Sequence, residues 1–456
     1  MGCGERITRR ELLSRLLAYG VGASLWRLMP AWAAPEEGVQ VGYLAQVDDL
    51  RARPRDPASS EVAAFGGLIG ARAAAEEMTA TARLLGRRFA LLAVSAPTPE
   101  AATHQAKRLV DRGVRILLGG FDFETARAVA EFAQRARILF FNVGTPDGRL
   151  RNEACSRYAF HVEASDAQYI DAIADWFIRG LAFLVDEDAP EGVRIIRRRP
   201  TRAWFLVTHD APIWQARRRR MQVALEQRHW GGRIAGDVTV RGGVAFDEVF
   251  RAIRAARPDL VLLLLPPARQ LDFYRAYDRS GLAFEVTGFP EPVTQTRAFF
   301  RALLLAAPRV ARGAVRTVLW EPTYKAHGSL ELSNRLLTRW GHPMDGPVWA
   351  SWFAVKSVWE LVLRSGTLDP DRLVEALEKG AVTFDGHKGI ALTFRPWDHQ
   401  LRQPLAMSRL VGLSQDPMEL AEAIGTFPNV LAPGRDPNQV LDQLGDRPGE
   451  TRCRWR

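Results

Sequence analysis

The sequence has 456 residues, a length that allows two or three domains. Hydrophobic residues make up 47% and charged residues 25%, which excludes a largely disordered chain. The formal net charge is +10, with arginines spread along the whole chain. The densest run, residues 217–220, falls in a predicted helix, where successive side chains point around the axis. We therefore expect a solvated helix surface at this run, with a lipid or partner surface as the alternative, and we do not expect a nucleic-acid-binding patch.

The first 34 residues are typical of an export signal. Arg9 and Arg10 precede an apolar stretch at residues 16–26. About 11 residues at 1.5 Å each are too few to cross a hydrocarbon core of roughly 30 Å. Residues 31–33 have the small-x-small pattern of a cleavage site. We predict a twin-arginine signal peptide cleaved after Ala33 or Ala34, and a periplasmic protein; an ordinary secretory signal or an uncleaved anchor are the alternatives.

Cleavage there would leave two cysteines, Cys155 and Cys453. In an oxidising compartment the two thiols either form a disulfide or stay unpaired. A disulfide would close a very long loop, which in the loop-entropy model stabilises the fold by several kcal/mol. Both alternatives stay open at this point.

The mature chain begins with alternating strands and helices. The predicted strands are residues 39–46, 89–94, 114–118 and 138–143, and the predicted helices are residues 62–82, 98–112 and 124–135. This alternation is the βαβ rhythm of a parallel sheet that is covered by helices on both faces.

A second α/β unit follows. Its predicted helices are residues 166–178, 214–228, 246–256 and 269–280, and its predicted strands are residues 203–208, 233–240, 260–265 and 284–288. A further strand at 315–320 and helices at 347–364 and 370–379 come after it. The tail beyond Gly412 has weak periodicity and many prolines, so we expect an extension that lies over the surface.

These patterns predict an α/β protein with two doubly wound parallel-sheet lobes, joined by a multi-crossover hinge and separated by a cleft. The boundaries that we predict are a signal peptide (1–34), the first part of lobe 1 (35–165), lobe 2 (166–288), a return segment of lobe 1 (289–372), a hinge with a return to lobe 2 (373–412) and a C-terminal extension (413–456).

The sequence contains no P-loop, no Gly-x-Ser-x-Gly and no His-Glu-x-x-His. The Gly66-Gly67-x-x-Gly70 pattern follows a long polar loop rather than a strand, so it does not fit a dinucleotide fingerprint. His161 and Glu163 have the spacing of a metal pair on one strand face, but a surface or cleft-lining pair is the favoured interpretation. We predict no catalytic residue, no metal and no cofactor.

The order of the weak motifs resembles one family. The chain is similar to the solute-binding proteins of ABC importers of the leucine/isoleucine/valine-binding type, which have the type I periplasmic binding fold. The resemblance covers residues 38–412 and is carried by residues 39–45, Gly67-x-x-Gly70-Ala71, and residues 105–113, 117–119, 139–145, 158–160, 204–210, 257–261 and 384–389.

A narrower resemblance concerns one branch of this family, whose members are linked to PQQ-dependent alcohol dehydrogenase systems. Residues 81–86, 142–155, 394–404 and 452–454 carry it. Cys155 and Cys453 both lie in these segments, and the resemblance therefore supports their pairing.

The family resemblance implies a ligand site between the lobes. In its amino-acid-binding members, a hydroxyl and backbone N–H groups after the third and fourth strands hold the ligand carboxylate, and an acidic residue of lobe 2 holds the ammonium. The hydroxyl position falls on Phe123, which cannot donate a hydrogen bond. The position after the fourth strand falls on Val143, through its backbone, and on Thr145, which keeps a hydroxyl.

On the second lobe, aromatic positions of the family fall on Trp214 and Pro266, and the acidic position falls on Pro290, with Glu291 beside it. An unpaired buried ammonium or carboxylate costs several kcal/mol. We therefore expect the ligand to be an alcohol, its aldehyde or acid, or a quinone-like molecule, rather than an α-amino acid.

Each of these residues also has a purely structural interpretation. Phe123 is then core packing, Thr145 a turn residue, and Trp214 a cap on the second lobe.

Taken together, the resemblance implies an exported, non-enzymatic protein that captures a small organic molecule and delivers it to an ABC permease in the inner membrane. A PQQ-dependent alcohol dehydrogenase system is a further expected partner. The alternatives are a periplasmic sensor, an enzyme or accessory protein for a dehydrogenase, and a branched-chain amino acid binding protein.

Overall fold

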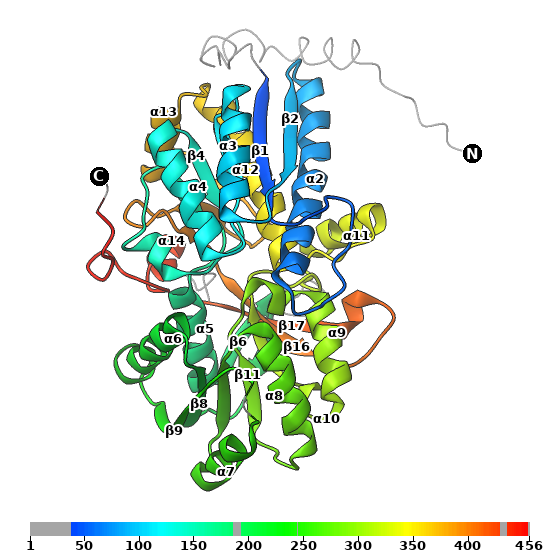
Figure 1. Cartoon of the computed structure of the whole chain (residues 1–456), viewed down its shortest axis with the longest axis vertical. Coiled ribbons are helices and arrows are strands. Elements are labelled where there is room, and N and C mark those ends of the chain that lie inside the picture. Colours follow the sequence, from blue (N-terminus) through cyan, green and yellow to red (C-terminus); the bar gives the residue numbers. More distant parts are fainter. Residues whose placement is uncertain (1–37, 186–192, 244, 429–435, 455–456) are drawn as a thin grey trace, which may run out of the picture.

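The computed structural model describes residues 38–185, 193–243, 245–428 and 436–454. Two lobes are stacked along the long axis of the molecule (Figure 1). The predicted signal peptide lies outside the described residues. None of the helices in the described part of the chain combines the length and the apolar character that spanning a membrane requires.

Lobe 1 is built on a five-stranded parallel sheet in the order β2-β1-β3-β4-β5. Alternate strand residues point to opposite faces, so Val41 and Tyr43 pack with α2, whereas Leu44 and Leu117 pack with α3 and α4. The elements are β1 (Val39–Ala45), α2 (Ser60–Leu84), β2 (Phe89–Ser95), α3 (Pro99–Asp111), β3 (Ile116–Gly119), α4 (Phe123–Ala136), β4 (Leu139–Asn142) and β5 (Ala159–His161).

Lobe 2 contains a four-stranded parallel sheet in the order β11-β10-β8-β9. The predicted helix 214–228 is split into α6 and a π-helical turn, η2. The elements are α5 (Asp166–Arg179), β8 (Ala203–His209), α6 (Pro212–Val223), η2 (Ala224–Arg228), β9 (Arg233–Val240), α7 (Asp247–Ala256), β10 (Leu260–Leu264), α8 (Pro267–Arg279) and β11 (Glu285–Gly288). Two doubly wound parallel-sheet lobes are thus confirmed.

A second sheet of lobe 2 is antiparallel and was not expected. Its order is β12-β16-β17-β6-β7. The strands are β6 (Leu181–Val185), β7 (Val193–Arg197), β12 (Val315–Val318), β16 (Leu405–Leu410) and β17 (Ala421–Phe427). The central strand β17 comes from the tail that we expected to lie over the surface. Its alanines, glycine and threonine, and a register shift in β16, hide the alternation by which a strand is recognised.

The chain also returns to lobe 1 later than the boundary at residue 289 that we expected. Helices α9 (Arg297–Ala306) and α10 (Pro308–Ala311) stay on lobe 2, because Phe299, Phe300 and Leu303 join the same buried cluster as β8 and β10. The return comprises α11 (Ser329–Trp340), α12 (Gly346–Ser365), α13 (Pro370–Glu378) and a small sheet of β13 (Phe384–Asp385), β14 (Ala391–Phe394) and β15 (Leu401–Arg402).

The glycines at the start of α2 allow α2 and α12 to pack closely. A Cβ atom on Gly70 would overlap the backbone carbonyl oxygen of Val348, and one on Gly67 would lie 2.8 Å from Oγ of Ser351. The two helices pack against each other, and Figure 1 shows α2 beside β2 and α12 behind β1. The glycine pattern in the sequence therefore serves helix packing.

We expect Gly70→Ala to lower the free energy of unfolding by about 1–3 kcal/mol, because α2 and α12 must move apart to admit the methyl group. Urea denaturation measures the change. Gly242→Ala is the control, since a Cβ atom there meets no heavy atom within 4 Å. Equal stabilities of the two variants would contradict this account of the helix contact.

Candidate ligand-binding site between the lobes

The lobes meet where the strands of both parallel sheets end. The short helix η3 (Pro292–Gln295), which follows β11 of lobe 2, packs against α2 and α12 of lobe 1. On the lobe 1 side, the segments after β3 and β4 carry Phe123, Val143 and Thr145. The open carboxyl edge of a parallel sheet is where ligands of such folds bind.

Thr145 occupies a turn that is fixed from several sides. Its N–H donates to Oδ1 of Asn142 at 3.0 Å, and its carbonyl accepts from Nδ2 of the same residue at 2.9 Å. The buried Arg151 also donates to that carbonyl, at 3.3 Å, and to the carbonyl of Glu163, at 2.7 Å. The Thr145 hydroxyl accepts a long bond from the N–H of Asp147, which leaves its own proton for another acceptor.

The other two positions predicted on lobe 1, Val143 and Phe123, make contacts within the protein. The N–H of Val143 donates to the carbonyl of Gly119 at 3.0 Å, so the backbone donor that we expected to hold a ligand extends the sheet ladder instead. Phe123 begins α4, and the Arg149 guanidinium lies 3.4 Å above its ring. Arg149 is in turn held by Asp147 at 2.7 Å. The ring is therefore a cation–π platform at the edge of the site.

On the lobe 2 side, Trp214 and Glu291 are joined through two residues that sequence reasoning missed, Arg217 and Phe289. The Arg217 guanidinium lies 4.5 Å from the Trp214 ring and 4.0 Å from the Phe289 ring. It also pairs with the Glu291 carboxylate through Nη1. The spacing of Trp214 and Arg217 by three residues, which puts them on one helix face, was the signal that could have found this cluster.

The expected solvated surface at residues 217–220 is therefore wrong for three of the four arginines. The Arg217 side chain is only 3% exposed, Arg218 pairs with Asp237, and Arg220 lies 2.9 Å from Asp171. Acidic residues from other elements compensate these arginines, and sequence periodicity does not show such long-range pairs.

Asp166 connects the two sides of the site. Its N–H donates to the carbonyl of Pro146 at 2.8 Å, directly after Thr145. Its carboxylate lies 3.7 Å from Nε of Arg217. Burial raises the pKa of Asp166 to about 6, although the Arg217 charge acts against this rise. Thr145 and Trp214 thus belong to one connected arrangement.

In the described part of the chain, two predicted positions contribute no polar side-chain contact to this arrangement. Pro266 caps α8, and its carbonyl accepts from the N–H of Gln270 at 2.9 Å. The Pro290 carbonyl accepts from Nε2 of Gln295 at 3.0 Å, so the position expected to hold an ammonium group offers no side-chain acceptor. Within the described residues, the Phe123 ring contacts Arg149 and the Pro266 carbonyl belongs to the first turn of α8, so neither residue is part of the Arg217 cluster.

A buried acidic residue, Glu163, follows β5. Glu163 accepts a hydrogen bond from the Tyr169 hydroxyl at 2.6 Å, and that hydroxyl accepts from Gln295 at 2.9 Å. Burial raises the pKa of Glu163 to about 8, despite the opposing Tyr169 hydrogen bond. Neighbouring His161 is also buried, and burial lowers its pKa well below the usual range. No group of three or more potential metal ligands occurs in the parts of the chain that the structure describes.

Glu163 makes stability depend on pH. Its ordinary pKa is 4.5 and its folded pKa is about 8, so the folded state holds the proton more tightly. The stabilisation is complete below pH 4.5 and is lost as the pH rises towards 8, with a slope of at most about 1.4 kcal/mol per pH unit. Urea denaturation of Glu163→Gln across pH 5–8 should lack this slope, whereas Glu331→Gln, which changes an exposed side chain of α11, should keep it. If the free energy of unfolding depends on pH in the same way for the wild type and Glu163→Gln, the protonation of buried Glu163 is contradicted.

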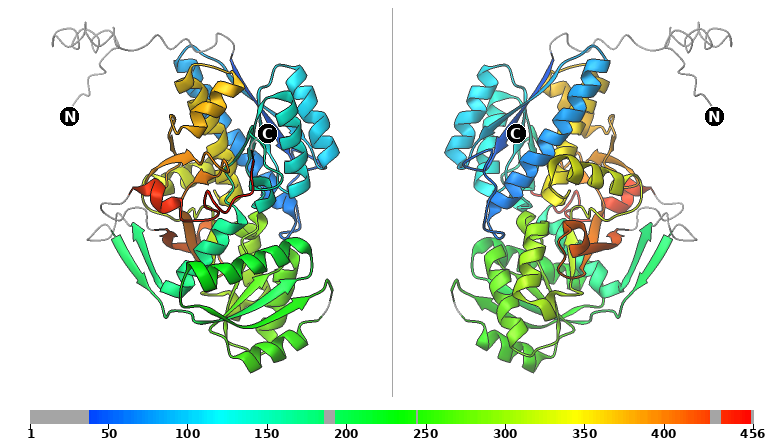
Figure 2. Two further views of the ribbon diagram at one scale, coloured as in Figure 1. Left: turned by 90° about the vertical axis from the view of Figure 1, so that its left-hand side faces the viewer. Right: turned by 90° about the vertical axis from the view of Figure 1, so that its right-hand side faces the viewer.

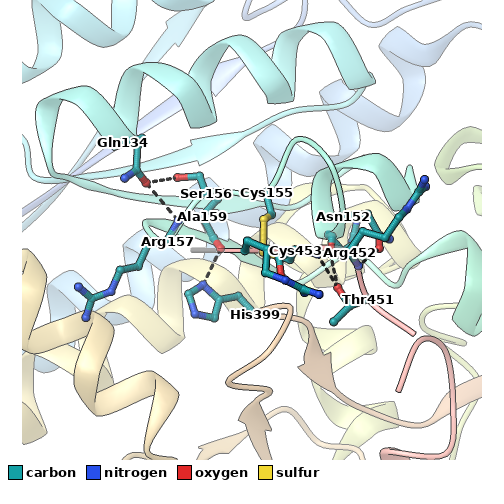
Figure 3. The surroundings of a disulfide bond; sticks show 12 residues. Gln134, Asn152, Cys155, Ser156, Arg157, Ala159, His399, Thr451, Arg452 and Cys453 are labelled. Atoms are coloured by element: carbon teal, nitrogen blue, oxygen red, sulfur yellow. Dashed lines mark hydrogen bonds between the residues drawn. A yellow bond between two sulfur atoms is a disulfide. The ribbon is translucent and has the colours of Figure 1, made fainter. Parts of the chain in front are cut away.

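The structure confirms the pairing of the two mature cysteines. Cys155 and Cys453 form a disulfide across a sequence separation of 298 residues (Figure 3). The bond joins the C-terminal segment to the loop between β4 and β5 (Figure 3).

Two doubly wound lobes that meet at the carboxyl ends of their strands, and between which the chain passes more than once within the described residues, define a two-lobed binding protein. The model of the family described as periplasmic binding protein matches residues 56–415, and the chain belongs to that family. No curated protein matches the chain.

Solved structures support the same fold. A branched-chain amino acid ABC transporter periplasmic ligand-binding protein from Burkholderia xenovorans has a TM-score of 0.71 at 16% identity, covering 91% of this chain and 99% of that one. A leucine-, isoleucine-, valine-, threonine- and alanine-binding protein from Brucella ovis has a TM-score of 0.71 at 14% identity, with 92% and 99% covered. A solute-binding protein from R. palustris in complex with benzoate has a TM-score of 0.63 at 14% identity, with 91% and 99% covered. At such identities the similarity shows the fold alone.

Proposed function

We propose that this protein is the solute-binding component of an ABC importer and captures a small organic molecule other than an α-amino acid between its lobes. The ligand is held and released without any bond being made or broken. Neutral alcohols and aldehydes, including aromatic ones, fit the site better than zwitterions. Membership of the periplasmic binding protein family supports the general role.

The pairing of Glu291 with Arg217 is the observation that carries this proposal. Glu291 directly follows Pro290, the position on which the ammonium-binding acidic residue of amino-acid-binding members falls. Because its carboxylate already pairs with a buried arginine, binding an ammonium group there would require breaking that ion pair. Arg217, which is only 3% exposed, would then keep only the Asp166 carboxylate at 3.7 Å as an acidic partner, and the loss of its closer partner would cost free energy.

The remaining groups suit a less charged ligand. The rings of Trp214 and Phe289 meet edge to face at 5.8 Å and give lobe 2 an aromatic wall. The Thr145 hydroxyl supplies a donor from lobe 1. Arg217 and Arg149 both carry acidic partners, so neither offers an uncompensated charge to a carboxylate. The benzoate complex of one structural neighbour is consistent with an aromatic ligand in this fold.

A thermal-shift panel on the mature protein tests the ligand class. The panel contains leucine, benzyl alcohol, benzaldehyde, benzoate, short-chain alcohols and their aldehydes, and PQQ. A ligand at 100 times its dissociation constant adds about 2.7 kcal/mol of stability. We expect a shift with an alcohol or aldehyde, recovery of that compound unchanged, and none with leucine. A shift with leucine alone would overturn the proposal.

A matched pair of variants tests the Thr145 hydroxyl. Thr145→Val removes the donor at nearly constant volume and should weaken binding of a hydroxyl- or carbonyl-bearing ligand by about 1 kcal/mol, roughly fivefold. Thr103→Val, on α3, is the control and should leave the affinity unchanged. Equal affinities for all three proteins would remove Thr145 from the site.

We also propose that the protein is exported to the periplasm by the twin-arginine route and serves a PQQ-dependent alcohol oxidation system. Support comes from the paired arginines Arg9 and Arg10 and from the branch resemblance at residues 81–86, 142–155, 394–404 and 452–454. Deleting the gene should impair growth on the alcohols that bind, but not on succinate. Normal growth on those alcohols would contradict this role.

A further inference from the structure

The C-terminal segment, residues 436–454, lies across the junction of the lobes. It begins with α14 (Pro437–Leu441), and Figures 1 and 2 show it running past the point where lobe 1 and α5 of lobe 2 meet. Leu441, Leu444 and Cys453 are almost completely buried, so the segment is packed into the protein rather than laid on its surface.

One end of this segment is fixed to lobe 1 by two arginines, Arg395 directly after β14 and Arg402 in β15. Asp442 accepts from Nε of Arg402 at 2.7 Å and from Nε of Arg395 at 3.2 Å. The fully buried Arg395 also donates to the carbonyls of Leu441 and Leu444, both at 2.6 Å.

The other end is fixed to lobe 1 through the loop after β4. The Thr451 hydroxyl donates to the carbonyl of Arg151 at 3.0 Å, and the N–H of Arg452 donates to Oδ1 of Asn152 at 2.8 Å (Figure 3). The disulfide between Cys453 and Cys155 makes this attachment covalent.

Between these two ends, lobe 2 holds the segment. Arg228, at the end of η2, donates to the carbonyls of Gln443 and Gly445 at 3.0 and 2.7 Å and pairs with Glu450 at 2.7 Å. The buried Asp171 of α5 accepts from the N–H of Gly445 at 2.8 Å.

Asp446 joins the lobes directly. Its carboxylate lies 3.2 Å from Nη1 of Arg220 in lobe 2 and 3.3 Å from Nδ2 of Asn152 in lobe 1. Its carbonyl accepts from the Trp397 indole at 3.2 Å. Residue 446 is therefore the point at which the segment, lobe 1 and lobe 2 all meet.

We propose that residues 442–453 form a covalently secured strap that restricts the opening of the lobes. Both ends of the strap are fixed to lobe 1 and its middle is held by lobe 2. Opening must therefore break the contacts of Arg228, Asp171 and Arg220 with the strap, or release one end from lobe 1. The disulfide prevents release of the C-terminal end, so its reduction favours the open form. The inference rests on the proposed function, which requires the lobes to separate around a ligand.

Single-molecule energy transfer between the lobes tests the strap without any ligand. Dyes are attached through p-acetylphenylalanine at positions 107 and 251, exposed sites on α3 of lobe 1 and α7 of lobe 2. The full mature chain is compared with Cys155→Ser/Cys453→Ser and with Asp446→Ala. We expect a shift to longer inter-dye distances and a broader distribution in both variants, and in the wild type after reduction.

The control is Arg452→Gln, which removes an exposed ion pair with Glu153 at the lobe 1 end and should leave the distribution unchanged. A single cooperative melt establishes that each variant is folded. If the cysteine variant does not fold, Asp446→Ala still tests the strap, because this variant keeps the disulfide. Unchanged distances in the folded variants overturn the strap. The energy-transfer experiment contains no ligand. Its result therefore does not depend on whether the thermal-shift panel identifies a ligand.

Discussion

Arg297→Met should lower the free energy of unfolding by about 3–5 kcal/mol at neutral pH, because it leaves the Glu321 carboxylate buried and unpaired. The Arg297 and Glu321 side chains are 3% and 0% exposed. Nη1 of Arg297 lies 3.1 Å from Oε2 of Glu321, close to the second crossing between the lobes. Urea denaturation measures the loss, which is the largest that we expect from any single substitution considered.

The pH dependence of this effect has a defined sign. Burial favours the neutral form of Glu321, but the Arg297 charge and hydrogen bonds from Arg297, Ser408 and Thr323 hold its pKa below the usual value. The pair therefore stabilises the protein above pH 4.5 and loses this contribution as the pH falls through the folded pKa. The difference between wild type and Arg297→Met should shrink in acid. The double variant Arg297→Met/Glu321→Gln should recover much of the stability, and no recovery would contradict the pairing account.

Arg217→Met should cost about 2–4 kcal/mol, because it removes the cation that Glu291 and Asp166 share at the candidate site. Both carboxylates keep some exposure to water, so the loss should be smaller than at Arg297. The variant should also weaken ligand binding, since the guanidinium supports the rings of Trp214 and Phe289. Denaturation and a titration with the ligand found in the panel provide the two measurements.

Arg219→Met is a control on the same helix, because Arg219 is exposed and its change should stay within about 0.5 kcal/mol. Adding Glu291→Gln to Arg217→Met should restore part of the stability, because the unpaired carboxylate is removed. A loss at Arg219 as large as that at Arg217 would show that charge density on α6, rather than the Glu291 pair, sets the effect.

The parallel sheets of both lobes could be predicted from the sequence. Strands such as β10 are short apolar runs between amphipathic helices, and that pattern is local. Strand β17 could not be predicted, because its alanines, glycine and threonine hide the alternation of a strand, and one of its two neighbours, β6, comes from a distant part of the chain. Residues 297–306, which form α9, were expected in the return segment of lobe 1 for a related reason, since the sequence does not show which lobe covers their apolar side chains.

The candidate site was predicted only in part. Thr145 and Trp214 are candidates from the family resemblance, and the structure connects them through Asp166 and Arg217. Arg217 was missed because it belongs to a run of arginines that looked solvated, and its burial depends on Glu291, 74 residues later. The N–H of Val143 was expected to hold a ligand, but the sheet uses it. Long-range pairing of charges decides such positions, and one sequence does not reveal it.

Titration calorimetry of leucine, and of the alcohol or aldehyde that gives the largest thermal shift, tests the central claim most directly. With Glu291 paired to Arg217 and Phe123 at the hydroxyl position, we predict saturable binding of the alcohol or aldehyde and no heat of binding for leucine. Micromolar binding of leucine, with no response to the alcohols or aldehydes, would contradict the claim and make the protein an amino acid binder.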